Sequence, residues 1–185
     1  MNILLVGVGG QGVITAARAL FEAYALAGRR VVGSELHGMS QRGGRLNVHL
    51  RVDEDGGTLV PLGRCDLLLC LELIEGVRTL SYCSSKTSCV ALDRVIPPPS
   101  SGAAPPAEEL VEALRKRIGG LRLLNYDSLA KEVGSRSVNV SLLGAAMREL
   151  ELNKGVLLKA LEAAVKDSAL KNAQRALELG AKLFE

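Results

Sequence analysis

The glycine-rich segment at residues 7–12 is the first stretch whose residue types and spacing could do chemistry. Its sequence, GVGGQG, matches the dinucleotide-binding fingerprint. Glycines at these positions let the backbone approach an anion at the positive end of the following helix. They also permit tight strand-to-helix turns that bind nothing. We therefore predict a cofactor-binding loop, hereafter the glycine loop, and keep the purely structural interpretation beside it. Its predicted binding residues are Gly7, Gly9, Gly10 and Gly12.

A second segment, SELHGMSQRGG at residues 34–44, carries more reactive side chains and is called the arginine loop below. Its predicted binding residues are Ser40, Gln41, Arg42 and Gly43. Arg42 and His37 are the two catalytic candidates. Arg42 suits a substrate or cofactor anion, or it pairs with Glu35 to brace the loop. His37 could relay protons near neutral pH, although an isolated histidine is more often a hydrogen-bonded anchor.

Glu35 bears on a competing hypothesis, a stand-alone oxidoreductase that binds a nicotinamide or flavin dinucleotide. The fingerprint needs an acidic residue at the end of the second strand to hold the ribose hydroxyls, and Glu35 stands at about that distance. Glu35 lies within the arginine loop and runs straight into residues 36–39, LHGM, which leaves this hypothesis incomplete. The sequence has no GxxxxGK[ST] segment, so nothing indicates a P-loop nucleotidase.

Both loops must be positioned by the elements around them. Residues 3–6 form an apolar run typical of a strand buried on both faces. Residues 12–26 show helical spacing, and residues 31–35 indicate a second strand. This order predicts the opening of a Rossmann-like βαβ unit with a right-handed crossover.

A hairpin is expected to interrupt that order. Residues 46–52 alternate apolar and polar side chains, as a strand with two different faces does. The polar residues of this segment are Asn47, His49 and Arg51. We expect this polar face to meet solvent or a partner. A turn at residues 55–57 and a return strand over residues 58–62 would complete the hairpin and make the sheet mixed.

The remaining sequence continues the alternation of strands and helices. Further strands are predicted at residues 66–71, 88–93 and 121–124, and helices at residues 72–80, 106–118, from Asp127 or Ser128, from Ser141 to about Leu150, and at the C-terminal end. An apolar stripe between Ala169 and Phe184 must pack on something, and it would suit a dimer or heteromer if exposed. The predicted fold is α/β, three-layered, with a mostly parallel but mixed sheet and a helical C-terminus, in a single domain over residues 1–185.

Three single residues outside the two loops have a functional and a structural interpretation. Glu72 and Glu75 lie one helical turn apart and could form a carboxylate pair, but acidity at a helix start explains them more simply. Asn139 is better explained as a cap or backbone clamp than as a ligand.

Composition excludes several classes of function. The net charge of +3 is small and spread along the chain, and aromatic residues make up only 3%, so a nucleic-acid footprint is not expected. No apolar run approaches the ~18 residues of a membrane span, and no basic leader precedes the first apolar stretch. The four cysteines match neither a zinc nor a cluster-binding spacing, so no metal is expected, and free thiols suit the cytoplasm.

The motifs taken together resemble one known family. GVGGQGV at residues 7–13, the arginine loop and the alternating strand after it are similar to the gamma-type domain of 2-oxoacid:ferredoxin oxidoreductases. The MSQRGG form of the loop resembles the indolepyruvate type most closely. Further matches are CDLLL at residues 65–69, LELIE at residues 71–75, and Asn139 followed by LGA at residues 143–145.

The resemblance implies a division of labour. Thiamine diphosphate, iron–sulfur clusters and coenzyme A would belong to the holoenzyme, with none bound by this chain alone. A larger thiamine- and cluster-carrying subunit would be the partner, and ferredoxin an indirect one. The chain would act in the oxidative decarboxylation of an aryl pyruvate and be inactive alone. A homodimer of the isolated chain is a separate expectation, which depends on the C-terminal apolar stripe rather than on the resemblance. The alternatives that stay open are the dinucleotide-binding oxidoreductase and a non-catalytic assembly protein.

Overall fold

A six-stranded mixed sheet lies at the centre of the computed structural model, which describes residues 1–38, 44–97 and 103–184. The strands, in the order in which they lie across the sheet, are β2 (Val31–His37), β3 (Arg45–Val52), β1 (Asn2–Val8), β4 (Leu67–Cys70), β5 (Ser88–Leu92) and β6 (Gly120–Leu124). The four strands from β1 to β6 run parallel, and β3 is antiparallel to both of its neighbours. The mixed sheet predicted from the sequence is thus confirmed.

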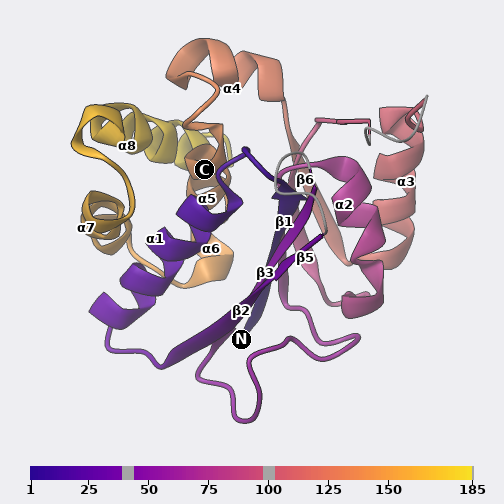
Figure 1. The fold of residues 1–185 in the computed structure, drawn as a ribbon, viewed down its shortest axis with the longest axis horizontal. Helices are drawn as coiled ribbons and strands as arrows, with labels where there is room; N and C mark the ends of the chain where they lie inside the picture. The colour runs from indigo at the N-terminus through magenta and orange to yellow at the C-terminus, as the bar shows by residue number, and fades with distance from the viewer. Residues whose placement is uncertain (39–43, 98–102, 185) are drawn as a thin grey trace.

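Helices cover both faces of the sheet and give the three layers expected (Figure 1). One layer holds α1 (Val13–Leu26), α5 (Val138–Ala145), α6 (Met147–Leu150), α7 (Lys154–Ala164) and α8 (Asp167–Lys182). The other holds α2 (Leu73–Arg78), the short 3-10 helix η1 (Leu80–Tyr82) and α3 (Ala107–Arg117), while α4 (Tyr126–Val133) lies beyond the carboxyl ends of the strands. Among the residues described, no helix is long and apolar enough to cross a membrane.

The buried apolar residues of the strands divide between two clusters, one on each face. Ile3, Leu5 and Leu69 join the core beneath α1, α5, α7 and α8. Leu4 and Leu68, one residue away, join the core beneath α2 and α3. This follows from the period of two in a strand, and it explains why the parallel strands read as continuous apolar runs.

The partner strand predicted for the hairpin was wrong. The antiparallel partners of β3 are β2 and β1. The register with β2 runs from Val31↔Val52 to His37↔Leu46, and the register with β1 includes Asn2↔Arg51. Both edges of β3 are therefore occupied, and no edge remains for residues 58–62, which form no strand. The inserted hairpin is β2–β3, and residues 34–37 of the arginine loop belong to β2 rather than to its connection with β3.

The polar face of β3 is buried rather than solvated, which corrects a second expectation. Asn47 and His49 are fully buried and Arg51 is 6% exposed. The segment between β3 and β4 folds over His49 and Arg51. The Arg51 guanidinium donates from Nε to Asn2 Oδ1 (3.0 Å) and from Nη2 to the Asp55 carbonyl (2.9 Å). A buried guanidinium needs these acceptors, and they anchor the segment to the sheet.

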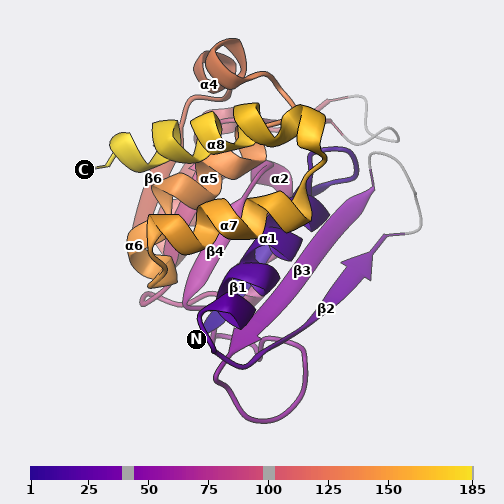
Figure 2. The ribbon, with the colours of Figure 1, turned by 90° about the vertical axis from the view of Figure 1, so that its left-hand side faces the viewer.

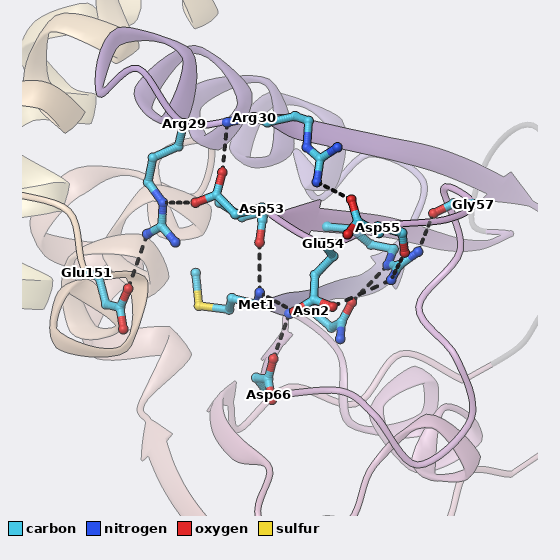
Figure 3. A network of polar contacts seen from close by, with 12 residues as sticks. Met1, Asn2, Arg29, Arg30, Asp53, Glu54, Asp55, Gly57, Asp66 and Glu151 are labelled. Atoms are coloured by element: carbon cyan, nitrogen blue, oxygen red, sulfur yellow. Dashed lines mark hydrogen bonds and ion pairs between the residues drawn. The ribbon is translucent and has the colours of Figure 1, made fainter.

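Charged residues around the N-terminus also anchor the segment that follows β3 (Figure 3). The Met1 ammonium lies 2.7 Å from Glu54 Oε1 and donates to the Val52 carbonyl at 2.8 Å. Arg29 bridges Asp53 (2.7 Å) and Glu151 (3.1 Å), so α1, β3 and the region after α6 are tied together at this end of the sheet.

Two helix starts differ from the prediction. Asn125, rather than Asp127 or Ser128, caps α4 by accepting from the Ser128 amide at 2.8 Å. The helix expected to start at Ser141 starts at Val138, so Ser141 lies inside α5, fully buried. Residues to 150 form two short helices, α5 and α6, rather than one.

The C-terminal apolar stripe packs inside the chain. Helix α8 lies along α5 (Figure 2), with Gly180 against the Ser141 carbonyl and Gly144 against the Leu177 carbonyl. No Cβ fits at either contact, so the two backbones approach as closely as glycine permits. The stripe is consequently not the exposed surface that would suit a dimer or heteromer.

Candidate functional site

The glycine loop joins β1 to α1 at the carboxyl edge of the parallel strands. Gly10 and Gly12 have φ values of 100° and 79°, a region that side chains with a Cβ rarely adopt. Gly12 is also the N-cap of α1, and it supplies no side-chain cap. The first-turn amides of α1 therefore remain available to a ligand, at the positive end of a 14-residue helix.

Gln11 closes one side of this loop from within. Its Oε1 accepts from the Val8 amide at 2.9 Å, and its Nε2 donates to the Leu71 carbonyl at 2.9 Å. A Cβ on Gly7 would stand 2.7 Å from that Oε1, so glycine is needed there for packing. Gly7 thus lies within β1, where it makes room for Gln11, and it lines neither of the two cavities described below. The link that Gln11 makes between β1 and the end of β4 was not predicted from the sequence.

Asn139 clamps the end of the glycine loop, as its interpretation as a backbone clamp predicted. Its Nδ2 donates to the Gly12 carbonyl at 2.9 Å, across 127 residues of sequence. A Cβ on Gly12 would lie 2.5 Å from the same Nδ2. The side chain is 3% exposed, and its Oδ1 has no hydrogen-bond partner among the described residues.

A cavity of about 360 Å³, hereafter the switch-point cavity, opens on one side of the glycine loop. The chain leaves β1 toward β2 and β3 but leaves β4 toward β5, so the strand order reverses between β1 and β4. Open α/β sheets bind ligands at such a point. Gly9 and Gly10 line the cavity together with Leu71, Arg94 and Arg136.

Arg94 is held in place by an aromatic ring. Its guanidinium carbon lies 3.9 Å from the centre of the Tyr126 ring, within the range of a cation–π contact. Asp93 fixes the backbone of Tyr126, because Asp93 Oδ1 accepts a hydrogen bond from the Tyr126 amide at 2.7 Å. Arg94, Tyr126 and Arg136 were not predicted from the sequence. The position of Arg94 just after a parallel strand was the available signal.

A second cavity of about 340 Å³, hereafter the hairpin cavity, lies on the other side of the glycine loop. Gly9, Gly10 and Gly12 line it with His37 and Arg45. The structure thus brings three of the predicted glycines and the predicted histidine to one cavity. Its other lining residues are Val13, Ile14, Gly44 and Leu46.

The roots of the arginine loop are tied to the sheet and to the glycine loop. The Gly9 amide donates to the Gly44 carbonyl (3.0 Å), and the Gly38 amide donates to the Arg45 carbonyl (2.8 Å). His37 Nε2 stands 3.2 Å from Glu35 Oε2. The predicted residues Ser40, Gln41, Arg42 and Gly43 lie outside the described residues, and so does the predicted pairing of Arg42 with Glu35.

The position of Glu35 argues against a dinucleotide site of the ordinary kind. In that fold the second strand is the neighbour of the first, whereas here β3 separates β2 from β1. Two strand spacings put Glu35 roughly 10 Å from β1 across the sheet. The carboxylate faces His37 instead, so the acidic half of the fingerprint is not assembled beside the glycine loop.

Two buried carboxylates at α2 brace the base of this region. Glu72 caps α2 by accepting from the Glu75 amide at 2.8 Å, which confirms the structural interpretation of its acidity, and burial raises its pKa. Glu75 accepts from Arg78 Nη1 at 2.6 Å, and its other oxygen lies 3.7 Å from Arg45 Nε. Glu75 therefore links α2 to the start of β3 beside the hairpin cavity.

The cysteines take no part in either cavity. All four are free and buried, and burial raises the pKa of the Cys70 and Cys89 thiols, which suits core residues rather than nucleophiles. Within the described ranges, no group of three or more His, Cys, Asp or Glu side chains could hold a metal ion.

Comparison with known proteins gives consistent matches. Residues 2–183 match the family model described as pyruvate ferredoxin/flavodoxin oxidoreductase. The chain is 37% identical over 150 residues to indolepyruvate oxidoreductase subunit IorB of Methanothermobacter thermautotrophicus, covering 78% of this chain and 76% of that one. It is 35% identical to IorB of Thermococcus kodakarensis, covering 98% and 94% respectively.

Solved structures support the same fold. The gamma subunit of a keto/oxoacid ferredoxin oxidoreductase from Geobacter sulfurreducens superposes with a TM-score of 0.72 at 19% identity, covering 99% of this chain and 97% of that one. A 2-oxoglutarate:ferredoxin oxidoreductase from Magnetococcus marinus, with 2-oxoglutarate, coenzyme A and succinyl-CoA bound, gives a TM-score of 0.75 at 19% identity. The match covers all of this chain and 31% of that one.

Proposed function

Since the chain belongs to the pyruvate ferredoxin/flavodoxin oxidoreductase family, we propose that it is the small subunit of an indolepyruvate-type 2-oxoacid:ferredoxin oxidoreductase. In this proposal its two cavities face the reaction centre of a larger subunit. That subunit carries the thiamine diphosphate that supplies decarboxylation and the iron–sulfur clusters that pass electrons to ferredoxin. The complex resides in the cytoplasm, where four free thiols stay reduced.

The observation that carries the proposal is the convergence of cations and free amides on one edge of the sheet. Arg94 and Arg136 line the switch-point cavity, and neither has a carboxylate partner among the described residues. On the other side of the glycine loop, the first turn of α1 and His37 line the hairpin cavity. Unpaired guanidinium groups beside a helix start favour an anionic ligand.

Coenzyme A is the anionic ligand we assign to the switch-point cavity. The Magnetococcus marinus structure has coenzyme A bound. Its phosphates suit Arg94 and Arg136, because guanidinium groups bind phosphate in a bidentate fashion. The work of this chain is then to bind and orient the acyl acceptor. His37, Ser40, Gln41, Arg42 and Gly43 are proposed to act at the hairpin cavity side, toward the 2-oxoacid and the partner.

The first test is reconstitution with the larger subunit. We expect coenzyme A-dependent reduction of ferredoxin with indolepyruvate only when both subunits are present, and no turnover by this chain alone. Arg94→Ala and Arg136→Ala should each raise KM for coenzyme A about tenfold or more, because a charged hydrogen bond contributes roughly 1.5–3 kcal/mol. The measurement is initial rate against coenzyme A concentration at saturating 2-oxoacid.

Arg115→Ala provides the matched control, because this arginine lies exposed at the end of α3 and outside both cavities of the glycine loop. It should leave KM unchanged. Unchanged KM in the Arg94 and Arg136 variants would remove coenzyme A from the switch-point cavity and favour the assembly-protein alternative. A complete redox cycle by the isolated chain would remove the subunit role itself.

A further inference from the structure

Strand β2 forms one edge of the sheet (Figure 2). The backbone hydrogen bonds identify which of its residues point outward. The Gly38 amide donates to the Arg45 carbonyl, and the Asp53 amide donates to the Arg30 carbonyl. Backbone groups of an antiparallel strand point to alternate sides, so even-numbered residues of β2 bond β3. The odd-numbered residues, Val31, Gly33, Glu35 and His37, direct their amides and carbonyls away from the sheet.

Of the features that usually protect an edge strand, β2 carries the charge of the exposed Glu35, and it has no lysine, proline or bulge. Natural proteins block such edges with lysine, proline, bulges or a very short strand. Strand β2 is seven residues long, VVGSELH, and its register with β3 runs without a bulge from Val31↔Val52 to His37↔Leu46. Leu36 is 39% exposed, a large apolar side chain on a strand that ends the sheet.

The sequence of β2 is complementary to itself. We propose that two copies of this chain pair antiparallel through β2 about a two-fold axis at Ser34, forming one continuous sheet across the dimer. In this register Val31 faces His37 of the other copy, and Gly33 faces Glu35 of the other copy. Both are pairs of outward-pointing residues, so each pair exchanges two hydrogen bonds.

The side chains of the other face fit the same register. Val32 of one copy lies opposite Leu36 of the other, which covers the exposed leucine with an apolar partner. Ser34 lies opposite Ser34. The Ser34 hydroxyl lies 2.5 Å from that of Thr58, so the segment after β3 contacts β2 at the proposed axis.

Neighbouring registers are less favourable. Moving the axis to residue 35 places Glu35 opposite Glu35 of the other copy, and like charges directly opposite each other are destabilising. Moving it to residue 33 places His37 opposite Arg29, a residue already engaged by Asp53 and Glu151. The charge pattern of the strand therefore selects the axis at Ser34.

The pairing uses the edge of the sheet, whereas the proposed coenzyme A site is the switch-point cavity, which no residue of β2 lines. The pairing does place a second copy next to His37, which ends β2 and lines the hairpin cavity. Dimerisation can be tested without any activity measurement, so its failure and that of the proposed function are separable.

The decisive variant is Ser34→Cys in the full chain. Residues facing each other across the axis at an even position form a non-hydrogen-bonded pair, with Cα atoms about 4.5 Å apart, within the range of a disulfide. With oxidised glutathione as the oxidant, the two introduced thiols, one from each copy, become one disulfide, and the glutathione disulfide becomes two thiols. We expect most chains to run as a covalent dimer on a non-reducing gel.

Leu36→Cys is the control, because residue 36 is exposed but pairs with residue 32. Its two thiols would stand roughly 13 Å apart, four residues along the strand, and should stay reduced. The native cysteines are buried and should not interfere. Equal cross-linking of both variants, or a monomer in sedimentation equilibrium with Ser34→Cys left reduced, would overturn the proposal.

Discussion

His49 illustrates at the level of one residue how an alternating strand can hide its polar side. The ring is fully buried, its Nδ1 accepts from the Val60 amide at 3.1 Å, and the Tyr82 ring meets it edge-on at 5.1 Å. Burial, with the Arg45 charge nearby, lowers the pKa of His49 to about 4. The imidazole is thus neutral in the folded protein at pH 7.

The pKa of His49 makes stability depend on pH in a defined window. Between about pH 4 and 6.5 the unfolded chain binds a proton that the folded chain does not, so stability rises with pH there and falls as the solution is acidified. Between pH 7 and pH 4, the free energy of unfolding of the wild-type chain should fall by roughly 3 kcal/mol more than that of His49→Asn. Asparagine keeps an acceptor for the Val60 amide. Urea unfolding of both proteins across this range makes the comparison, and parallel pH profiles would show that His49 titrates normally.

Single-residue roles were only partly predictable from the sequence. The glycine loop and the Asn139 clamp were predicted because their residue types allow few alternatives. The burial of Asn47, His49 and Arg51 was not predicted, because alternation shows that two faces differ and not what covers them. Arg94 and Arg136 were missed, since residues 94 and 136 meet only after β5 and the start of α5 are brought together in the fold.

At the level of elements, the contact between α5 and α8 depends on two glycines. A Cβ on Gly180 would overlap the Ser141 carbonyl, and one on Gly144 would overlap the Leu177 carbonyl. Both obstacles are backbone atoms, which cannot move aside as a side chain can. The helices must therefore separate to accept even a methyl group.

Gly180→Ala should destabilise the chain by about 2–3 kcal/mol, the usual effect of overpacking a core. Gly155→Ala in α7 is the control, because the nearest atom to its Cβ would be Asn153 Oδ1 at an ordinary 3.4 Å. That substitution should stabilise the chain by up to about 1 kcal/mol through helix propensity. The free energy of unfolding in urea reports both. Similar values for the two variants would mean that α8 is free to move away from α5.

Element types were predicted better than element partners. The strands and long helices follow from apolar periodicity, and their bounds agree within a few residues. The partner of β3 was misassigned because a turn at residues 55–57 is a local signal, whereas the pairing with β2 is decided by which edges of the sheet are free. The start of α5 was misplaced because serine is common at helix caps, and Ser141 is instead buried within the helix.

At the level of the whole molecule, pairing through β2 predicts that stability depends on protein concentration. A hundredfold rise in concentration should raise Tm by roughly 3–4 °C, because the dimer is linked to folding by mass action. Val32→Lys with Leu36→Lys places lysines opposite each other across the axis and should abolish this dependence.

Val32→Lys with Leu36→Glu places opposite charges there, and the concentration dependence should return. Scanning calorimetry at two concentrations measures all three proteins. A Tm of the wild-type chain that does not change with concentration would contradict the dimer.

The sequence was enough to predict the fold class, the mixed sheet and the family. The prediction was possible because the glycine loop, the arginine loop and the strand after it stand in the same order in this chain as in the family it resembles. The shape of the candidate site was not predicted. The two cavities arise from the strand order β3-β1-β4, which sets the glycine loop between a hairpin and a switch point, and strand order is a property of pairing rather than of local sequence.

The antiparallel direction of β3 has a consequence for which part of this protein can change in sequence during evolution. The connection from Gly38 to Gly44 is fastened at both roots, by the Arg45 carbonyl on one side and by the Gly9 amide on the other. A segment anchored in this way can be lengthened or rewritten with little entropic cost to the scaffold. The sheet and the glycine loop beneath it can therefore keep their structure when the sequence of this connection changes.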